Sequence, residues 1–347
     1  MNFDLKSLSQ PFSNQIILDG KRYLYFSGTA YLGIPNHQEF ISYFIEGISK
    51  YGLNNGTSRT NNIQLGIYEE AENHAAKMFS APASLITSSG YLAAQLVVKA
   101  FASRRNILYA PASHSALWDG IPNQITDSFL SWSEKVIETI NSSSEGDWVL
   151  ISNSMNNLVP EIYDFSFLKR VDHTKKITLI VDDSHGIGIN NAGLGIFHSL
   201  PKQENITNIV VASMAKALGI DAGIVFSSSS VIAKLQKSNM FIGASPPSAA
   251  ALYAFVRGED IYKTQLQKLA KNVLYLQSQR FEKWTFAQQF PVFLMNEAKI
   301  ADELFNHNIL ISSFPYPHPN SLPFNRIVLS SWHTDDDLQK LISALKA

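Results

Sequence analysis

The segment Ile180–Gly186 holds two carboxylates, a hydroxyl and an imidazole in the order Asp182, Asp183, Ser184 and His185. A run of apolar residues precedes it, so Asp182 is expected to end a buried strand. Ligands bind at that end of a strand in open α/β sheets. An aspartate there can meet a buried cationic group, and the alternative is that it caps a loop.

Three other functions could use residues of the same segment. Asp182, Asp183 and His185 could bind a metal. A serine hydrolase triad is disfavoured, since adjacent strand positions point to opposite faces and the sequence has no G-x-S-x-G elbow. A dinucleotide loop starting at Gly186 fails, because the position of its third glycine holds Asn191.

A fourth interpretation uses Lys216, which follows a second apolar run and has no charged neighbour on either side. A lysine in apolar surroundings has a lowered pKa and suits covalent chemistry with carbonyl groups. Alternatively, it is a surface lysine whose stem lies along apolar neighbours. Together, Lys216 and Asp182 match the needs of pyridoxal phosphate, namely an amine for its aldehyde and a carboxylate for its ring nitrogen.

Alternating elements must position these groups. The Asp19–Gly20 pair predicts a hairpin within 16–26, and Asn36 is expected to cap a helix that runs to Lys50 and ends at Gly52. Residues 53–64 are predicted to be a loop. Helical and strand patterns then alternate, which predicts an α/β fold with a mostly parallel sheet. The expected helices are 68–79 and 91–102, and the expected strands are 84–87, 107–110, 148–152, 177–182, 209–212 and 223–227.

The pattern changes after Pro246–Pro247. One long helix is predicted over 248–279, followed by strands at 292–295 and 326–331. A last helix should begin after Thr334, with three aspartates in its first turn. We therefore expect residues 1–50 to pack with a small α+β domain at 246–347, and residues 51–245 to form a large cofactor-binding domain.

Composition excludes several classes of protein. The 347 residues carry a net charge of −1 and no cysteine, which argues against a nucleic-acid partner, thiolate metal sites and disulfides. The sequence shows no secretory signal and no apolar run long enough to span a membrane, so a cytoplasmic location is expected. Charged residues make up only 16% of the chain. One explanation for this low fraction is that part of the surface is buried between subunits.

The chain resembles the α-oxoamine synthases, which belong to the fold-type I pyridoxal phosphate enzymes with a class II aminotransferase-like fold. The resemblance covers about Tyr25 to Leu345. Its anchors are Tyr31-Leu32-Gly33, Gly56-Thr57-Ser58-Arg59, Ser89-Gly90-Tyr91, Ser113-His114-Ser115, Val181 to Gly186, Ser213 to Gly219, Pro246-Pro247, and Arg326 with His333.

The resemblance implies a role for each site residue. Lys216 would bind the cofactor aldehyde, Asp182 its ring nitrogen and His185 its phenolic oxygen. His114 would stack on the ring. The residues that would bind the cofactor and its phosphate are Ser89, Gly90, Tyr91, Ser154 and Ser213.

The resemblance also places the substrate. Arg326 would bind the carboxylate of an amino acid, with Thr29 replacing an asparagine that helps in the family. A hydroxyl that usually reaches the partner subunit's phosphate is replaced by Ile242 and Gly243. The implied enzyme is a homodimeric transferase that condenses a small amino acid with an acyl thioester and releases carbon dioxide. An aminotransferase is the alternative, a cofactor-binding protein without catalysis is a further one, and a metal hydrolase is the last.

Overall fold

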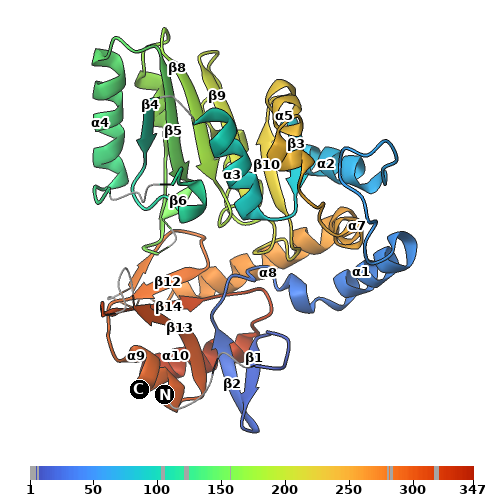
Figure 1. Cartoon of the computed structure of the whole chain (residues 1–347). Coiled ribbons are helices and arrows are strands. Elements are labelled where there is room, and N and C mark those ends of the chain that lie inside the picture. Colours follow the sequence, from blue (N-terminus) through green and yellow to red (C-terminus); the bar gives the residue numbers. More distant parts are fainter. Residues whose placement is uncertain are drawn as a thin grey trace.

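A computed structural model describes residues 5, 8–102, 106–120, 125–156, 158–279, 281, 284–315 and 320–347. Two six-stranded sheets organise the chain (Figure 1). None of the helices in these ranges combines the length and apolar character needed to cross a membrane.

The larger sheet has the strand order β3-β10-β9-β8-β5-β4. Strands β4, β5, β8 and β9 run parallel, and β10 is antiparallel to both of its neighbours. The expected mostly parallel sheet is thus confirmed. The bounds are β3 Ala83–Thr87, β4 Asn106–Tyr109, β5 Asp147–Asn153, β8 Lys176–Asp182, β9 Ile206–Ser213 and β10 Gly223–Ser227.

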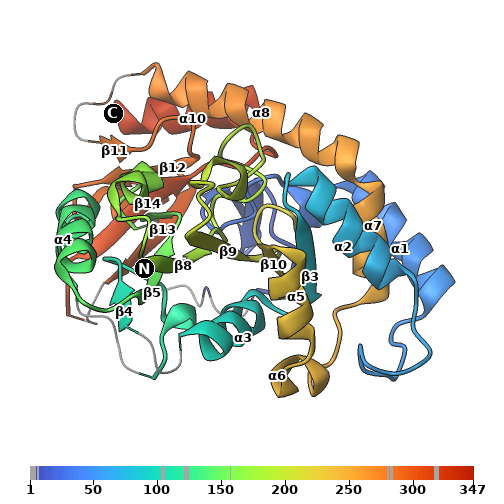
Figure 2. The ribbon, with the colours of Figure 1, turned by 90° about the horizontal axis from the view of Figure 1, so that it is seen from above.

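Helices cover both faces of this sheet because its strands are apolar on both sides (Figure 2). Along β9, Val211 packs in one hydrophobic cluster and its neighbours Val210 and Ala212 in the other. One face carries α3 (Gly90–Phe101) and α5 (Ser229–Gln236). The cluster on the other face includes α2 (Ile67–Met78), α4 (Phe129–Ser142), α7 (Ala249–Arg257) and α8 (Glu259–Gln277).

The smaller sheet is built from both ends of the chain, in the order β1-β2-β13-β14-β12-β11. The predicted hairpin forms, with Asp19 and Gly20 at positive φ in its turn, and its second strand pairs parallel with β13. The bounds are β1 Gln15–Leu18, β2 Lys21–Phe26, β11 Trp284–Phe286, β12 Val292–Met295, β13 Ile309–Pro315 and β14 Pro323–Val328.

The remaining elements are short or peripheral. They are the pair β6 (Met155–Asn156) and β7 (Glu161–Ile162), helices α6 (Asn239–Ile242) and α9 (Ile300–Asn306), and the 3-10 helices η1 (Ile34–Asn36), η2 (Ser115–Leu117), η3 (Phe165–Arg170) and η4 (Phe197–Ser199).

Helix α10 (Asp335–Leu345) begins as predicted. The Thr334 hydroxyl accepts from the Asp337 amide, and the Asp337 carboxylate accepts from the Thr334 amide. The side-chain Nδ2 of Asn14 also donates to this carboxylate, at 2.9 Å. The N-terminal hairpin is therefore fastened to the last helix.

Three expectations about elements are wrong. Helix α1 (Gln38–Tyr51) is capped by His37, because Pro35 holds Asn36 within the preceding 3-10 turn. The expected single helix over 248–279 is two helices that break at Gly258, where a Cβ would lie 2.9 Å from the Phe40 ring. The C-terminal part contributes four strands rather than two, since neither the three-residue β11 nor the seven-residue β13 was predicted.

Candidate active site

A cavity of about 210 Å³ lies at the carboxyl ends of β5, β8 and β9, beside the N-terminus of α3. We call it the strand-end cavity. It is lined by Gly90, Tyr91, His114, Ala116, Asn153, Met155, Asp182, Ser184, His185, Ser213 and Lys216. The structure thus brings together seven of the residues singled out in the sequence, from four separate segments of the chain.

Asp182 and Lys216 form the charged centre of this cavity. Asp182 is the last residue of β8, and its carboxylate accepts from the Ser184 amide at 2.9 Å. Burial lowers the pKa of the Lys216 amine, while the nearby Asp182 carboxylate opposes that shift. A partly buried amine with a lowered pKa is a better nucleophile at neutral pH than an exposed lysine.

Asp183 points away from the cavity and anchors the loop that follows β8. Its carboxylate accepts from the Ile196 amide at 2.7 Å. A Cβ at Gly186 or Gly195 would lie 2.1 or 2.3 Å from its oxygens, so both glycines are required by close packing. Burial raises the pKa of Asp183 to about 7, and the neighbouring Asp182 adds to the rise.

His185 is held by Tyr31, a residue from the N-terminal segment. The Tyr31 hydroxyl lies 2.8 Å from Nδ1 of His185. Burial raises the pKa of Tyr31, so it stays a neutral phenol. Burial and the charges of Lys216 and Arg326 hold the pKa of His185 well below its ordinary value. A neutral imidazole that accepts at Nδ1 carries its proton on Nε2 and can donate it to a ligand.

The N-terminus of α3 lies directly against Ser213. Ser89 caps the helix, because its hydroxyl accepts from the Leu92 amide at 3.1 Å. A Cβ at Gly90 would lie 2.6 Å from Cβ of Ser213, so only glycine permits this contact. The first amides of a helix have no partner within it and attract anions. Ser213 in turn donates its amide to the Ser184 hydroxyl, at 2.8 Å.

His114 lines the cavity from a loop rather than from a strand. Asn153 holds this loop in place. The amide of His114 donates to Oδ1 of Asn153 at 3.0 Å, and Nδ2 of Asn153 donates to the Ala112 carbonyl at 2.6 Å. Nδ1 of His114 accepts from the Ala116 amide. The imidazole itself is exposed, so a bound ring could lie against it.

Arg326 approaches this group from the smaller sheet. It lies on β14, and its guanidinium is 5.1 Å from the centre of the Phe314 ring. Burial lowers the pKa of Arg326, and its charge acts on both Tyr31 and His185. Thr29 is half-buried and does not line the cavity, although its carbonyl accepts from the Tyr31 amide.

Two expected cofactor-binding positions do not line the cavity. Ser89 does not line the cavity, and its hydroxyl caps helix α3 instead. Ser154 is fully buried behind the cavity, on the side of Asp183. His333, which served only as an anchor of the resemblance, has a structural role. It accepts from the Ser330 amide, contacts the Tyr25 carbonyl at 2.9 Å, and has a pKa lowered by burial to about 4.

The sequence predicted no role for three residues that shape the cavity, namely Tyr31, Asn153 and Met155. Asn153 was detectable as a polar residue at the end of a buried strand. Tyr31 was not, because its contact with His185 joins residues 154 positions apart.

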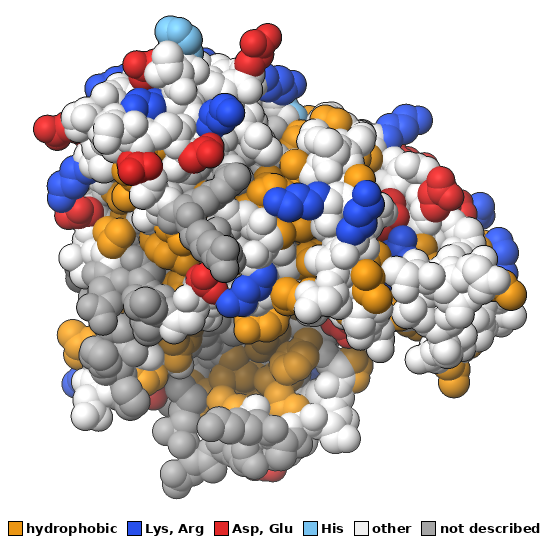
Figure 3. Space-filling view, turned by 45° about the horizontal axis from the view of Figure 1, so that its top comes forward, with side chains coloured by type: hydrophobic (Ala, Val, Ile, Leu, Met, Phe, Trp, Pro, Cys, Tyr) orange, Lys and Arg blue, Asp and Glu red, His pale blue; other side chains and the backbone are white. Residues whose placement is uncertain are grey.

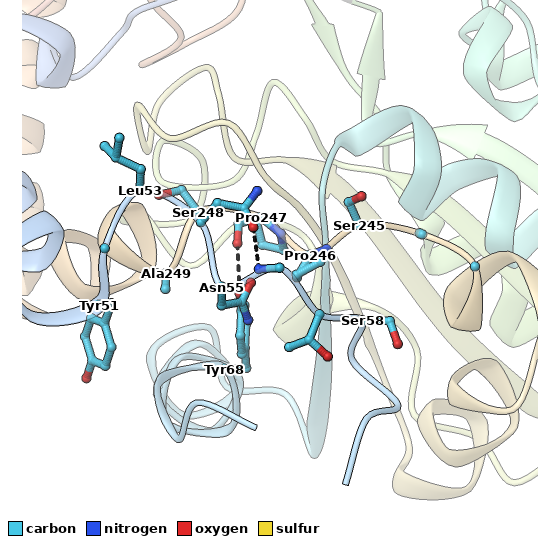
Figure 4. A pocket seen from close by; sticks show the side chains of 16 residues that line it. Tyr51, Leu53, Asn55, Ser58, Tyr68, Ser245, Pro246, Pro247, Ser248 and Ala249 are labelled. Carbon is cyan, nitrogen blue, oxygen red and sulfur yellow. Dashed lines mark hydrogen bonds between the residues drawn. The ribbon is translucent and has the colours of Figure 1, made fainter. Parts of the chain in front are cut away.

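A second recess, of about 560 Å³, lies between the loop after α1 and residues 243–249 (Figure 4). None of the predicted catalytic residues lines it. Two of its lining residues are joined by a hydrogen bond, in which the Tyr68 hydroxyl donates to the Pro247 carbonyl at 3.2 Å. The lining is uncharged and formed mainly by asparagine, serine, glycine and proline.

The described part of the chain contains no group of three or more histidine, aspartate or glutamate side chains that could hold a metal ion. The three residues considered for a metal do not converge on one point. Asp182 and His185 face the cavity, and Asp183 faces the Ile196 amide.

Solved structures of other proteins share this fold. Serine palmitoyltransferase from Sphingomonas wittichii has the same fold, with a TM-score of 0.79 and 16% identity over 96% of this chain and 88% of that one. The 8-amino-7-oxononanoate synthase structure from Francisella tularensis gives a TM-score of 0.69 at 19% identity, over 93% and 96% of the two chains. The expected fold-type I transferase fold is thereby confirmed.

The family model for aminotransferase class I and II matches residues 36–345, and the chain belongs to that family. It is also similar to the 8-amino-7-oxononanoate synthase of Lysinibacillus sphaericus, at 25% identity over 99% of this chain and 92% of the relative. The enzyme of that name from Pseudomonas syringae is 23% identical over 98% and 90%.

Replacing Tyr31 by Phe tests the contact that orients His185. We expect Nδ1 of His185 to lose its donor, so both neutral tautomers become populated, and the free energy of unfolding to fall by about 1 kcal/mol. Nitrogen-15 chemical shifts of the imidazole in the cofactor-free protein measure the tautomers. Tyr262→Phe, which removes a buried hydroxyl bonded to the Leu218 carbonyl, is the matched control. Unchanged His185 shifts in Tyr31→Phe would contradict this assignment.

Asp183→Asn should change how stability depends on pH. An unfolded aspartate ionises near 3.8, whereas native Asp183 ionises at about 7. Between these values the native state holds the proton more tightly, so this group's contribution to stability falls as pH rises and is fully lost above 7. The difference corresponds to at most ~4 kcal/mol.

Chemical unfolding of the cofactor-free protein at pH 4 to 8 measures this effect. The stability of the wild type relative to Asp183→Asn should decrease steadily across that range. The exposed Asp147→Asn is the control. A relative stability that is flat with pH would show that Asp183 is ionised throughout.

Proposed function

We propose that this chain binds pyridoxal 5'-phosphate in the strand-end cavity and condenses a small amino acid with an acyl thioester. The observation that carries the proposal is the meeting of Lys216, Asp182 and His185 with the N-terminus of α3 in one cavity. Pyridoxal phosphate supplies an aldehyde that an amine can bind and a ring that accepts an electron pair from the substrate's α-carbon.

The donor set fits this cofactor group by group. Ser213 and the amides that the Gly90 contact brings beside it would hold the phosphate. The Asp182 carboxylate would keep the ring nitrogen protonated, and Nε2 of His185 would donate to the phenolic oxygen. Lys216 would bind the aldehyde and, once released, hold or return the α-proton. His114 would lie against the ring.

Arg326 would hold the amino acid's carboxylate, since a guanidinium can bond both of its oxygens. In the overall reaction, a carbon–carbon bond forms between the α-carbon and the acyl carbonyl. The carbon–sulfur bond breaks and releases a thiol, and the amino acid's carboxyl group leaves as carbon dioxide. The names of the similar enzymes, serine palmitoyltransferase and 8-amino-7-oxononanoate synthase, support this reaction type.

A homodimer is part of the proposal. Tyr91 lines the cavity yet is 65% exposed, and Leu53 and Ile242, on or beside the 560 Å³ recess, are 81% and 43% exposed. A second copy that covered these exposed side chains would bury them. We also place the enzyme in the cytoplasm, with free amino acid and acyl thioester as its small-molecule partners.

The attachment of the cofactor can be tested directly. Protein loaded with pyridoxal phosphate should absorb visible light, and borohydride should fix the cofactor to the peptide that contains Lys216. Lys216→Ala should abolish this labelling, whereas Lys234→Ala should retain it, because Lys234 lies on α5 and donates to the Ala100 carbonyl. Labelling at Lys202 or Lys234 instead would refute the assigned site.

The family description also favours an aminotransferase as a second candidate. The two reactions differ in what they release. With a small amino acid and an acyl-coenzyme A, an acyltransferase should liberate free thiol and carbon dioxide in equal amounts. An aminotransferase should instead convert the cofactor to its amine form without a thioester, and a keto acid should restore it. The second outcome would reverse the choice of reaction and leave the cofactor site standing.

A further inference from the structure

Ser184 lines the strand-end cavity, and the proposed reaction gives its side chain no role. The residue is 7% exposed, so more than nine-tenths of it is buried. Its amide donates to Oδ1 of Asp182 at 2.9 Å, and its hydroxyl oxygen accepts from the Ser213 amide at 2.8 Å. Ser184 therefore contacts both the carboxylate expected at the ring nitrogen and a residue expected at the phosphate.

The hydroxyl group of Ser184 still has a hydrogen to donate. A serine hydroxyl offers one donor and two acceptor sites, and the Ser213 amide occupies an acceptor site. Among the described residues, none accepts the hydrogen of the Ser184 hydroxyl. Since buried hydroxyls nearly always have a partner, a buried donor without one in the wall of a cavity indicates a ligand that accepts from it.

The contact with Ser213 places this hydroxyl beside the N-terminus of α3. A Cβ at Gly90 would lie 3.0 Å from the Ser213 nitrogen, which is the atom that bonds the Ser184 hydroxyl. The Gly90 and Tyr91 amides form no hydrogen bond with the described residues, as is usual for the first residues of a helix. These two amides and the hydroxyls of Ser184 and Ser213 therefore lie at one end of the cavity, which all four residues line.

Neutral donors are the groups gathered at this end of the cavity. Among the described residues that line it, Lys216 is the only lysine or arginine, and the proposed function engages that amine with the cofactor aldehyde. Hydrophobic side chains gather inside the surface hollow that Figure 3 shows. A phosphate has three strongly accepting oxygens, so it can take hydrogen bonds from several neutral donors at once.

We propose that the Ser184 hydroxyl donates to the phosphate of bound pyridoxal phosphate, in addition to Ser213 and the first amides of α3. The inference rests on the proposed binding of that cofactor in the strand-end cavity. Because the Ser184 amide also bonds Asp182, this one residue would connect the phosphate to the carboxylate at the ring nitrogen. Phosphate binding would then help to hold the Asp182 carboxylate in place.

Two ligands that differ only in the phosphate test this role. Pyridoxal has the ring and the aldehyde of pyridoxal phosphate but carries a hydroxyl in place of the phosphate. Titration of the full-length protein freed of cofactor, followed by visible absorbance, gives the Kd of each ligand. In Ser184→Ala, the Kd of pyridoxal phosphate should rise about tenfold, because a hydrogen bond to a charged group is lost. The Kd of pyridoxal should change little.

Two further variants separate the hydroxyl from the packing around it. Ser184→Thr keeps a hydroxyl at this position and should keep the ratio of the two Kd values close to that of the wild type. Ser227→Ala is the matched control, since it removes a fully buried hydroxyl that donates to the Asn208 carbonyl at the other end of β10. It should alter neither Kd. An unchanged ratio in Ser184→Ala, even with both ligands bound more weakly, would overturn the inference, because Ser184 would then act only on its own loop.

The wild-type holoprotein provides a second measurement that needs no variant. A proton–phosphorus correlation spectrum should connect the Ser184 hydroxyl proton to the bound phosphate, because scalar coupling is transmitted through hydrogen bonds. A spectrum that shows the Gly90 and Tyr91 amide protons but lacks the Ser184 hydroxyl proton would overturn the inference.

Failure of the proposed function has a different signature. Wild-type protein that bound pyridoxal phosphate no more tightly than pyridoxal would refute both the phosphate site and the role of Ser184. Strong dependence on the phosphate in the wild type, together with the same dependence in Ser184→Ala, would refute the role of Ser184 alone.

Discussion

The site depends on holding the Lys216 amine and the Asp182 carboxylate together where water is scarce. Burial acts against charge on Lys216, and Asp182 partly restores it. The balance is possible because the parallel strands β5, β8 and β9 end at one edge of the larger sheet. There, Asn153 pairs with Asp182, and Asp182 pairs with Val211. A slip of one residue in either pairing would turn Asp182 to the other face.

Several contacts in and around the cavity hold the segments that build it in place. Ser184 joins the end of β8 to the end of β9 through the Ser213 amide. Asp183 holds the following loop through the Ile196 amide. On the far side of β3, Arg59 makes two 3.0 Å bonds to Glu72, which also accepts from the Ile86 amide. Such a buried ion pair fixes position more reliably than it adds stability.

Much of the larger sheet could be predicted from the sequence, because its strands are continuous apolar runs bounded by polar residues. Strand β10 was predicted with its observed bounds, and Asp182 was correctly placed at the end of β8. The break at Gly258 could not be predicted, since it depends on how closely the Phe40 ring approaches. The contact of Tyr31 with His185 likewise exists only once the N-terminal segment has packed.

The construction of the smaller sheet explains why residues near the two ends of the chain reach one site. Strand β2, five residues before Tyr31, pairs with β13, and β13 pairs with β14, which carries Arg326. The groups that orient His185 and that would bind substrate are therefore fixed to a single sheet. Any shift of that sheet relative to the larger one would move Tyr31 and Arg326 together. The orientation of the imidazole and the position of Arg326 are thus mechanically linked, although Tyr31 and Arg326 lie almost 300 positions apart in the sequence.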